Sequence, residues 1–355
     1  MRGARPPLGL LVGLLSLSTC APEDDLIVVE GERIDLFHEP HLELCAGTVP
    51  YLDRWIEFAA DQLDLDVDSF VHLRYLWLSE ARLEEIRPSS VNASAWASGE
   101  TSHAPSALHI HEVAHTVSAQ REIDALPFLA EGLATALSET WLRDDVLDGY
   151  LAPRADPRPF LTDSAQGLDY DMAAGFVGYL LSRHGTERFW RFYDSVGYLS
   201  SERRIRRRFA AIYDLDLDDA VDDYLLGECP EDARPIPLPP SCAGDLVPWE
   251  DDGTWVYSQA LDCADEAVAG GIVPDDPAQT GLETAVTVDV PEAGRYRFSH
   301  VSVSNFAVLY RCGGCPWLNE LLLPGEVELA AGRYALRLLA NRPQIDTVLL
   351  RRIDG

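Results

Sequence analysis

Two histidines and two glutamates with the spacing of a metal site lie in the first half of the chain. His111 and His115 are four residues apart with Glu112 between them, and Glu131 follows sixteen residues later. On a helix, residues four apart share one face, so the two imidazoles can bind the same metal ion. Glu112 lies a third of a turn away, where its carboxylate can take a proton from a water molecule instead of binding the ion. Such a set predicts a metal-dependent hydrolase.

A third protein ligand is needed, because catalytic zinc sites usually have three and leave one position open for water. Glu131 is the best candidate. The turn from Asp124 to Pro127 predicts a helix start. The residues after it place apolar side chains at helical spacing: Leu129, Leu133, Ala134, Leu137 and Trp141. If this stripe packs a second helix against the protein, Glu131 lies on the flank of that helix.

These motifs resemble those of the gluzincin metallopeptidases, and in particular the bacterial peptidase MA-like group. The resemblance covers roughly residues 70–225. It rests on HEVAH at residues 111–115, on FLAEGLA at residues 128–134 and on the helical stretch from Tyr170 to Phe192. It implies a zincin-type α+β domain. It also implies that His111, His115 and Glu131 bind zinc and that Glu112 is the general base.

The sequence therefore predicts a zinc-dependent peptidase that hydrolyses a peptide or protein substrate with a metal-activated water. An alternative remains open: a non-catalytic exported lipoprotein with a structural metal site, whose second domain binds glycan or protein. A fourth protein ligand would favour the alternative, whereas a position open to solvent would favour the enzyme. A hydrolase acting on another kind of bond is also compatible with these residues. Two imidazoles and a carboxylate accept several divalent ions, so the donor set does not by itself select Zn²⁺.

A hydrolytic transition state gains from a second group that donates a hydrogen bond to the oxyanion. Three side chains could do so, and the sequence does not rank them: Tyr170, Tyr179 and His184. In the resembling family an edge strand lies beside the cleft, which implies that role for Ala95–Ala97. His103 and His109 also fall near the motif, and we expect them to make ordinary polar contacts and not to bind metal.

The first twenty residues have the pattern of an export signal. Arg2 and Arg5 precede an apolar run from Leu8 to Leu17, which is too short to be a convincing membrane span. The four residues ending at Cys20 resemble a bacterial lipoprotein cleavage site, although Thr19 replaces the usual Gly or Ala. We expect a protein of the bacterial cell envelope, lipid-anchored through Cys20 or otherwise periplasmic or secreted, with that lipid as its only membrane contact.

Composition supports a folded and acidic protein. The chain has 59 acidic and 28 basic residues, a formal charge of −31, and 47% hydrophobic residues, so it can form a packed core and is a poor partner for nucleic acid. One segment, Glu202–Tyr213, is instead rich in arginine. It could face anionic lipid or another polyanion, but a solvated helix face balanced by the acidic stretch Asp214–Asp223 is the favoured interpretation.

The chain divides into four parts. They are the signal peptide at 1–20, a metallopeptidase domain at 21–228, a Pro-rich linker at 229–241 and an accessory domain at 242–355. In the second part we expect a helix at Thr48–Leu63 and a strand at Phe70–Leu78. The last part contains short alternating runs that predict an antiparallel β-sandwich: Thr284–Val290, Gly294–Ser299, Phe306–Arg311, Glu326–Leu329, Gly332–Ala340 and Thr347–Ile353.

Six cysteines remain after Cys20, an even number that suits an oxidising compartment. The simplest pairing keeps the bridges within each domain: Cys45 with Cys229, Cys242 with Cys263, and Cys312 with Cys315. The last pair could instead be a redox or zinc CxxC motif. No helix start and no second CxxC accompanies it, so a disulfide is favoured.

Overall fold

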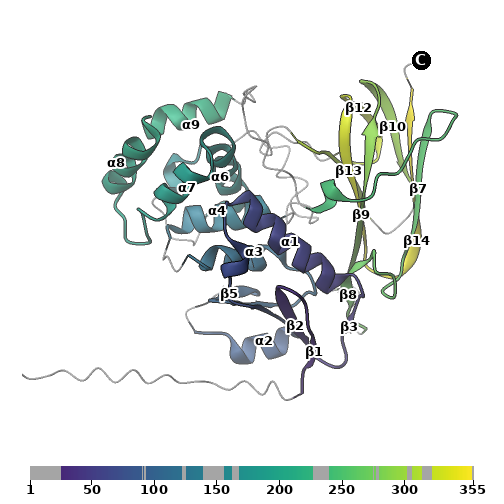
Figure 1. Cartoon of the computed structure of the whole chain (residues 1–355), viewed down its shortest axis with the longest axis horizontal. Helices are drawn as coiled ribbons and strands as arrows, with labels where there is room; N and C mark the ends of the chain where they lie inside the picture. Colours follow the sequence, from purple (N-terminus) through teal and green to yellow (C-terminus); the bar gives the residue numbers. More distant parts are fainter. Residues whose placement is uncertain are drawn as a thin grey trace, which may run out of the picture.

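The computed structural model describes residues 25–89, 91, 93–121, 125–138, 156–161, 168–226, 240–274, 276, 280–301, 306–313 and 322–353. The predicted signal peptide with Cys20, most of the predicted Pro-rich linker with Cys229, and Cys315 lie outside these residues. The described part is an α+β protein in which a helical region with one mixed sheet adjoins a set of antiparallel strands (Figure 1). This confirms the predicted α+β class and the β-rich part of the chain, whereas the zincin type of the helical region stays a prediction.

The first sheet has the strand order β1, β2, β4, β6, β5. Its strands are β1 (Ile27–Val29), β2 (Ile34–His38), β4 (Leu73–Trp77), β6 (Thr101–Ala104) and β5 (Trp96–Ser98). The three central strands are parallel, whereas β1 and β5 pair antiparallel with their neighbours. The predicted strand at Phe70–Leu78 therefore exists but is shorter at both ends, and β5 lies at one edge of the sheet.

The helices of this region are α1 (Thr48–Gln62), α2 (Glu80–Ile86), α3 (Ile110–Ala119), α4 (Pro127–Leu137), α6 (Tyr170–His184), α7 (Thr186–Tyr193), α8 (Glu202–Tyr213) and α9 (Leu217–Leu226). Local signals explain their ends. Pro127 opens α4 with a fixed φ that suits a first helical turn. The Asp169 carboxylate accepts a hydrogen bond from the Met172 amide at the start of α6, and Gly185, with φ of 81°, ends that helix.

Two further sheets form the predicted β-sandwich around a common hydrophobic core. One sheet has the order β12 (Gly325–Leu329), β10 (Gly294–His300), β14 (Gln344–Arg352), β7 (Thr254–Leu261). The other has the order β11 (Phe306–Arg311), β13 (Gly332–Ala340), β9 (Gly281–Val290), β8 (Ala269–Ile272), β3 (Glu43–Leu44). All pairings between these strands are antiparallel. Because β3 comes from the N-terminal part of the chain, the sandwich is built from both ends of the sequence.

The disulfides differ from the predicted pairing. The structure joins Cys45 to Cys263 and Cys242 to Cys312, so the predicted bridges of these four cysteines are wrong. The reason is topological: β3 pairs with β8, which brings Cys45 next to Cys263, and sequence spacing contains no information about that crossing. Two disulfides indicate folding in an oxidising compartment, and the protein is therefore exported. Within the described residues, no helix is long and apolar enough to cross a membrane.

Candidate metal centre

Helix α3 presents the two histidines because its other face is fixed in the core. Val113, Ala114 and Val117 are fully buried. His111 and His115, one turn apart, lie on the side that faces α4. Their side chains keep 12% and 19% of their surface exposed, and Glu131 keeps 21%, so the three groups remain accessible to a small ligand.

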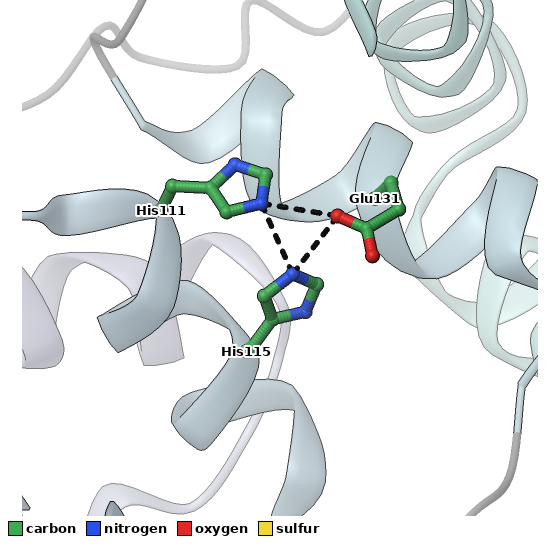
Figure 2. A group of neighbouring side chains, drawn as sticks. All are labelled: His111, His115 and Glu131. Atoms are coloured by element: carbon green, nitrogen blue, oxygen red, sulfur yellow. Dashed lines mark hydrogen bonds and ion pairs between the residues drawn. The ribbon is translucent and has the colours of Figure 1, made fainter. Parts of the chain in front are cut away.

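The three predicted ligands meet in a nearly equilateral triangle (Figure 2). Nε2 of His111, Nε2 of His115 and Oε2 of Glu131 are each 3.1 Å from the other two. In a tetrahedral zinc site with bonds of about 2.0 to 2.1 Å, neighbouring ligand atoms lie about 3.3 Å apart. The spacing and chemistry of the donors therefore fit a zinc ion. Within the described residues these three form the one group of His, Cys, Asp and Glu side chains close enough to hold a metal.

Close packing of α4 on α6 places Glu131. A Cβ atom at Gly132 would lie 2.7 Å from the carbonyl oxygen of Ala173 and 2.8 Å from a methyl group of Val177. Only glycine allows the two helix backbones to approach this closely. Four members of the predicted apolar stripe are buried, namely Leu129, Leu133, Ala134 and Leu137, whereas Trp141 lies outside the described residues.

The charges of the cluster favour a cation. Burial alone would raise the pKa of Glu131, but hydrogen bonds from His111 and His115 outweigh it and hold that pKa at about 2. Burial would lower the pKa of His115, and the hydrogen bond and charge of Glu131 reverse this, so the pKa is raised. A carboxylate that stabilises positive charge on two neighbouring imidazoles provides the electrostatic environment that a divalent metal needs.

Glu112 is buried on α3 beside the cluster. Burial raises the pKa of its carboxyl group to about 7, the positive charge of His115 opposes the rise, and the negative charge of Glu131 adds to it. Glu112 is not a member of the ligand triangle. Glu112 lies next to the triangle and has a pKa near neutral pH, which suits a group that accepts and returns a proton.

Thr135 adds a contact that sequence reasoning missed. Its Oγ1 lies 3.3 Å from Nδ1 of His111, on the ring edge opposite to the ligand atom. Such a partner fixes the orientation and tautomer of a metal-binding imidazole. The available signal was its position four residues after Glu131, which puts both side chains on the same face of α4.

The structure separates the three oxyanion candidates. The ring of Tyr170 packs edge-on to His111, with 5.7 Å between centroids, and 41% of the residue is exposed. Burial first, and then the charges of Glu131 and Glu112, raise its pKa to about 12, so its hydroxyl stays a proton donor. In contrast, Tyr179 donates a hydrogen bond to Asp223 at 2.8 Å, and His184 packs on Tyr213. Among the three, Tyr170 is thus the candidate that contacts a predicted ligand, His111.

Two other histidines, His103 and His109, fall near the motif in the sequence. His103 stacks on Trp96 of β5, with 4.6 Å between centroids, and Trp96 belongs to a hydrophobic cluster separate from the one that holds α3. His109 precedes the first turn of α3. Neither belongs to the ligand triangle. The predicted edge segment Ala95–Ala97 coincides in large part with β5 at the sheet edge.

No protein-family model and no curated protein matches the chain. Among solved structures, a periplasmic inhibitor of g-type lysozyme from Salmonella Typhimurium matches with 14% sequence identity and a TM-score of 0.21. The match covers 30% of this chain and 98% of the inhibitor. A likeness this low carries no conclusion about the metal centre or its function.

Proposed function

We propose that the protein is a zinc-dependent peptidase of gluzincin type. The observation that carries this proposal is the triangle of His111, His115 and Glu131, with buried Glu112 beside it. Three ligands without a fourth in the described residues support an open position, as in catalytic zinc sites. The resemblance of the two motifs to gluzincins supports peptide as the substrate.

In this mechanism His111, His115 and Glu131 hold the ion, which supplies Lewis acidity toward the attacking water and the scissile carbonyl. Glu112 accepts a proton from the water as it attacks and then passes the proton to the leaving amine. Thr135 keeps the His111 ring oriented. Tyr170 donates a hydrogen bond to the developing oxyanion. An extended substrate pairs through main-chain hydrogen bonds with β5, which is the edge strand of the sheet within the described residues.

The test begins with zinc content, measured by elemental mass spectrometry on the chain from residue 21, purified without added metal. We expect about one zinc per chain, and loss of the metal in His115→Ala. Absence of zinc, together with failure to take it up on addition, would contradict the proposal.

Glu112→Gln then separates binding from chemistry, because the amide keeps the volume of the side chain but cannot accept the proton. We expect unchanged zinc content and a fall of about 10²- to 10⁴-fold in cleavage of a peptide library. Glu80→Gln, at an exposed position on α2, is the matched control and should cleave like the wild type. Wild-type turnover in Glu112→Gln would refute the role of this carboxylate.

For the location, we propose attachment to the cell envelope by a lipid on Cys20. Support comes from the lipoprotein-like cleavage sequence and from the disulfides of an exported protein. Mass spectrometry of the mature N-terminus would detect the modified cysteine, and a mature chain without acyl groups would contradict the proposal.

A further inference from the structure

One face of α8 displays four arginines to solvent. Arg203 and Arg207 are one turn apart, as are Arg204 and Arg208, and all four residues are exposed. On the opposite side of the helix, Ile205, Phe209 and Tyr213 are buried in the core. The four guanidinium groups, called here the arginine face, therefore occupy one continuous side of an anchored helix.

The acidic stretch Asp214–Asp223 balances part of this helix, because Arg206 forms ion pairs with Asp218 at 2.9 Å and with Glu202 at 2.8 Å. Within the described ranges, no ion pair involves any residue of the arginine face. Four like charges at helical spacing repel one another. In a chain with a net charge of −31, this makes α8 a local basic surface for an external anionic partner.

An exposed apolar turn lies immediately before the arginine face. Tyr198 is 55% exposed and Leu199 is 92% exposed. Their turn is well fixed: the amide of Ser200 donates to the carbonyl of Gly197 at 2.8 Å, and the amide of Gly197 donates to the Ser200 hydroxyl at 3.0 Å. Gly197 also forms a β-bridge with Ala125, just before α4. An aromatic and an aliphatic side chain are thus held in water by a structured turn.

The same part of the molecule presents both features. Arg204 donates a hydrogen bond to the carbonyl of Ser195 at 3.0 Å, which ties the start of α8 to the segment that leads into the turn. Figure 1 shows α8 at the outer side of the helical region, on the side away from the sandwich. The sandwich therefore does not cover α8.

We propose that this surface docks on a lipid bilayer with anionic headgroups. Tyr198 and Leu199 enter the boundary between headgroups and acyl chains, where aromatic and aliphatic side chains are stabilised. The arginine face then lies at the level of the lipid phosphates and attracts them. Charge alone would suit any polyanion, but an apolar pair presented next to it favours a membrane. This inference does not depend on the metal centre.

Docking would give the protein a second membrane contact besides the lipid proposed at Cys20. The lipid proposed at Cys20 would hold the N-terminus of the chain, and a basic surface would determine how the folded part lies on the bilayer. The net charge of −31 repels the rest of the molecule from an anionic bilayer, so the arginine face also fixes the orientation.

The test is sedimentation of the chain from residue 21 with vesicles, since this chain keeps every described residue and lacks the lipid. Vesicles of phosphatidylcholine with about 30 mol % phosphatidylglycerol should bind it, whereas pure phosphatidylcholine vesicles and about 0.5 M salt should weaken binding at least tenfold. The double variant Leu199→Ser with Arg207→Glu should lower the partition coefficient at least tenfold.

The matched control makes the same changes on another surface. Ile345→Ser with Arg351→Glu alters an apolar residue that is 71% exposed and an exposed arginine of strand β14. This variant should bind like the wild type, and thermal unfolding should show that both variants keep their fold. Equal loss in both variants, no binding by the wild type, or binding of heparin but not of anionic vesicles would overturn the inference.

Discussion

Gly132 provides the sharpest test of how the fold positions the metal centre. It follows Glu131 on α4, and a Cβ atom there would lie 2.7 Å from the carbonyl oxygen of Ala173 on α6. Ordinary contacts of this kind begin near 3.4 Å, so Gly132→Ala must separate the two helices locally by about 0.7 Å. The obstacle is backbone and cannot rotate away as a flexible side chain would.

Two opposing effects determine how Gly132→Ala changes the free energy of unfolding. Alanine in a helix interior gains about 1 kcal/mol over glycine. Overpacking in a core costs about 1 to 3 kcal/mol. We therefore expect a net loss of about 1 kcal/mol. The larger consequence concerns Glu131, whose carboxylate must stay within about 0.5 Å of its position to hold a metal well. We expect zinc to bind at least about tenfold more weakly.

Gly175→Ala is the control, because it makes the same substitution in the neighbouring helix α6. Its Cβ would meet the hydroxyl group of Tyr224 at 2.5 Å, which is the end of a side chain and does not involve α4. Competition with a chromophoric chelator measures zinc affinity, and urea unfolding measures stability. If Gly132→Ala bound zinc as tightly as the wild type and Gly175→Ala, the close approach of α4 and α6 would not be what positions Glu131.

Three further substitutions test individual contacts. Thr135→Val removes the partner of His111 Nδ1 and should weaken zinc binding about tenfold, whereas Thr135→Ser should restore it in the same chelator competition. Tyr170→Phe should lower peptide turnover about a hundredfold while zinc content is unchanged, and near-normal turnover would remove this residue from the mechanism. His184 has a pKa of about 4 because of burial, supported by the nearby arginine charges, against 6.5 for the ordinary side chain. The unfolded chain therefore binds the proton first as pH falls, and stability is lost between about pH 6.5 and 4. Between these two pH values the free energy of unfolding of His184→Phe should therefore fall by about 1 kcal/mol less than that of the wild type. Urea unfolding at both pH values measures this difference, and a pH profile identical to that of the wild type would contradict the assignment.

Local patterns allowed much of this structure to be predicted. The strands predicted at Phe306–Arg311 and Gly332–Ala340 have the same ends as β11 and β13, and the helix predicted at Thr48–Leu63 ends one residue earlier. Alternation and helical spacing report which side of a segment is buried, and that property is local. The pair His111 and His115 is equally local, since one helix turn determines it.

The position of Glu131 relative to these histidines was a prediction about packing. It rested on an apolar stripe and on the resemblance to gluzincins, and the structure brings the three donors together. The strand β8 was missed, because two glycines interrupt any alternation in it. The Cys45–Cys263 bridge was missed for a related reason: its two cysteines are 218 residues apart, and only the pairing of β3 with β8 makes them neighbours.

The pairing of β3 with β8 gives the sandwich a role in holding the helical region in place. The amide of Ala46 donates to the carbonyl of Cys263 at 2.8 Å, and the hydroxyl of Thr48 donates to the carbonyl of Gly270 at 2.7 Å. Helix α1 begins at Thr48, so its first turn is fixed to the sandwich by hydrogen bonds and by the disulfide of Cys45. Helix α1 also packs in the same core as α3, which bears the histidines. By holding α1 in place, the sandwich supports α3 and its two histidines, whether or not the sandwich also binds a ligand of its own.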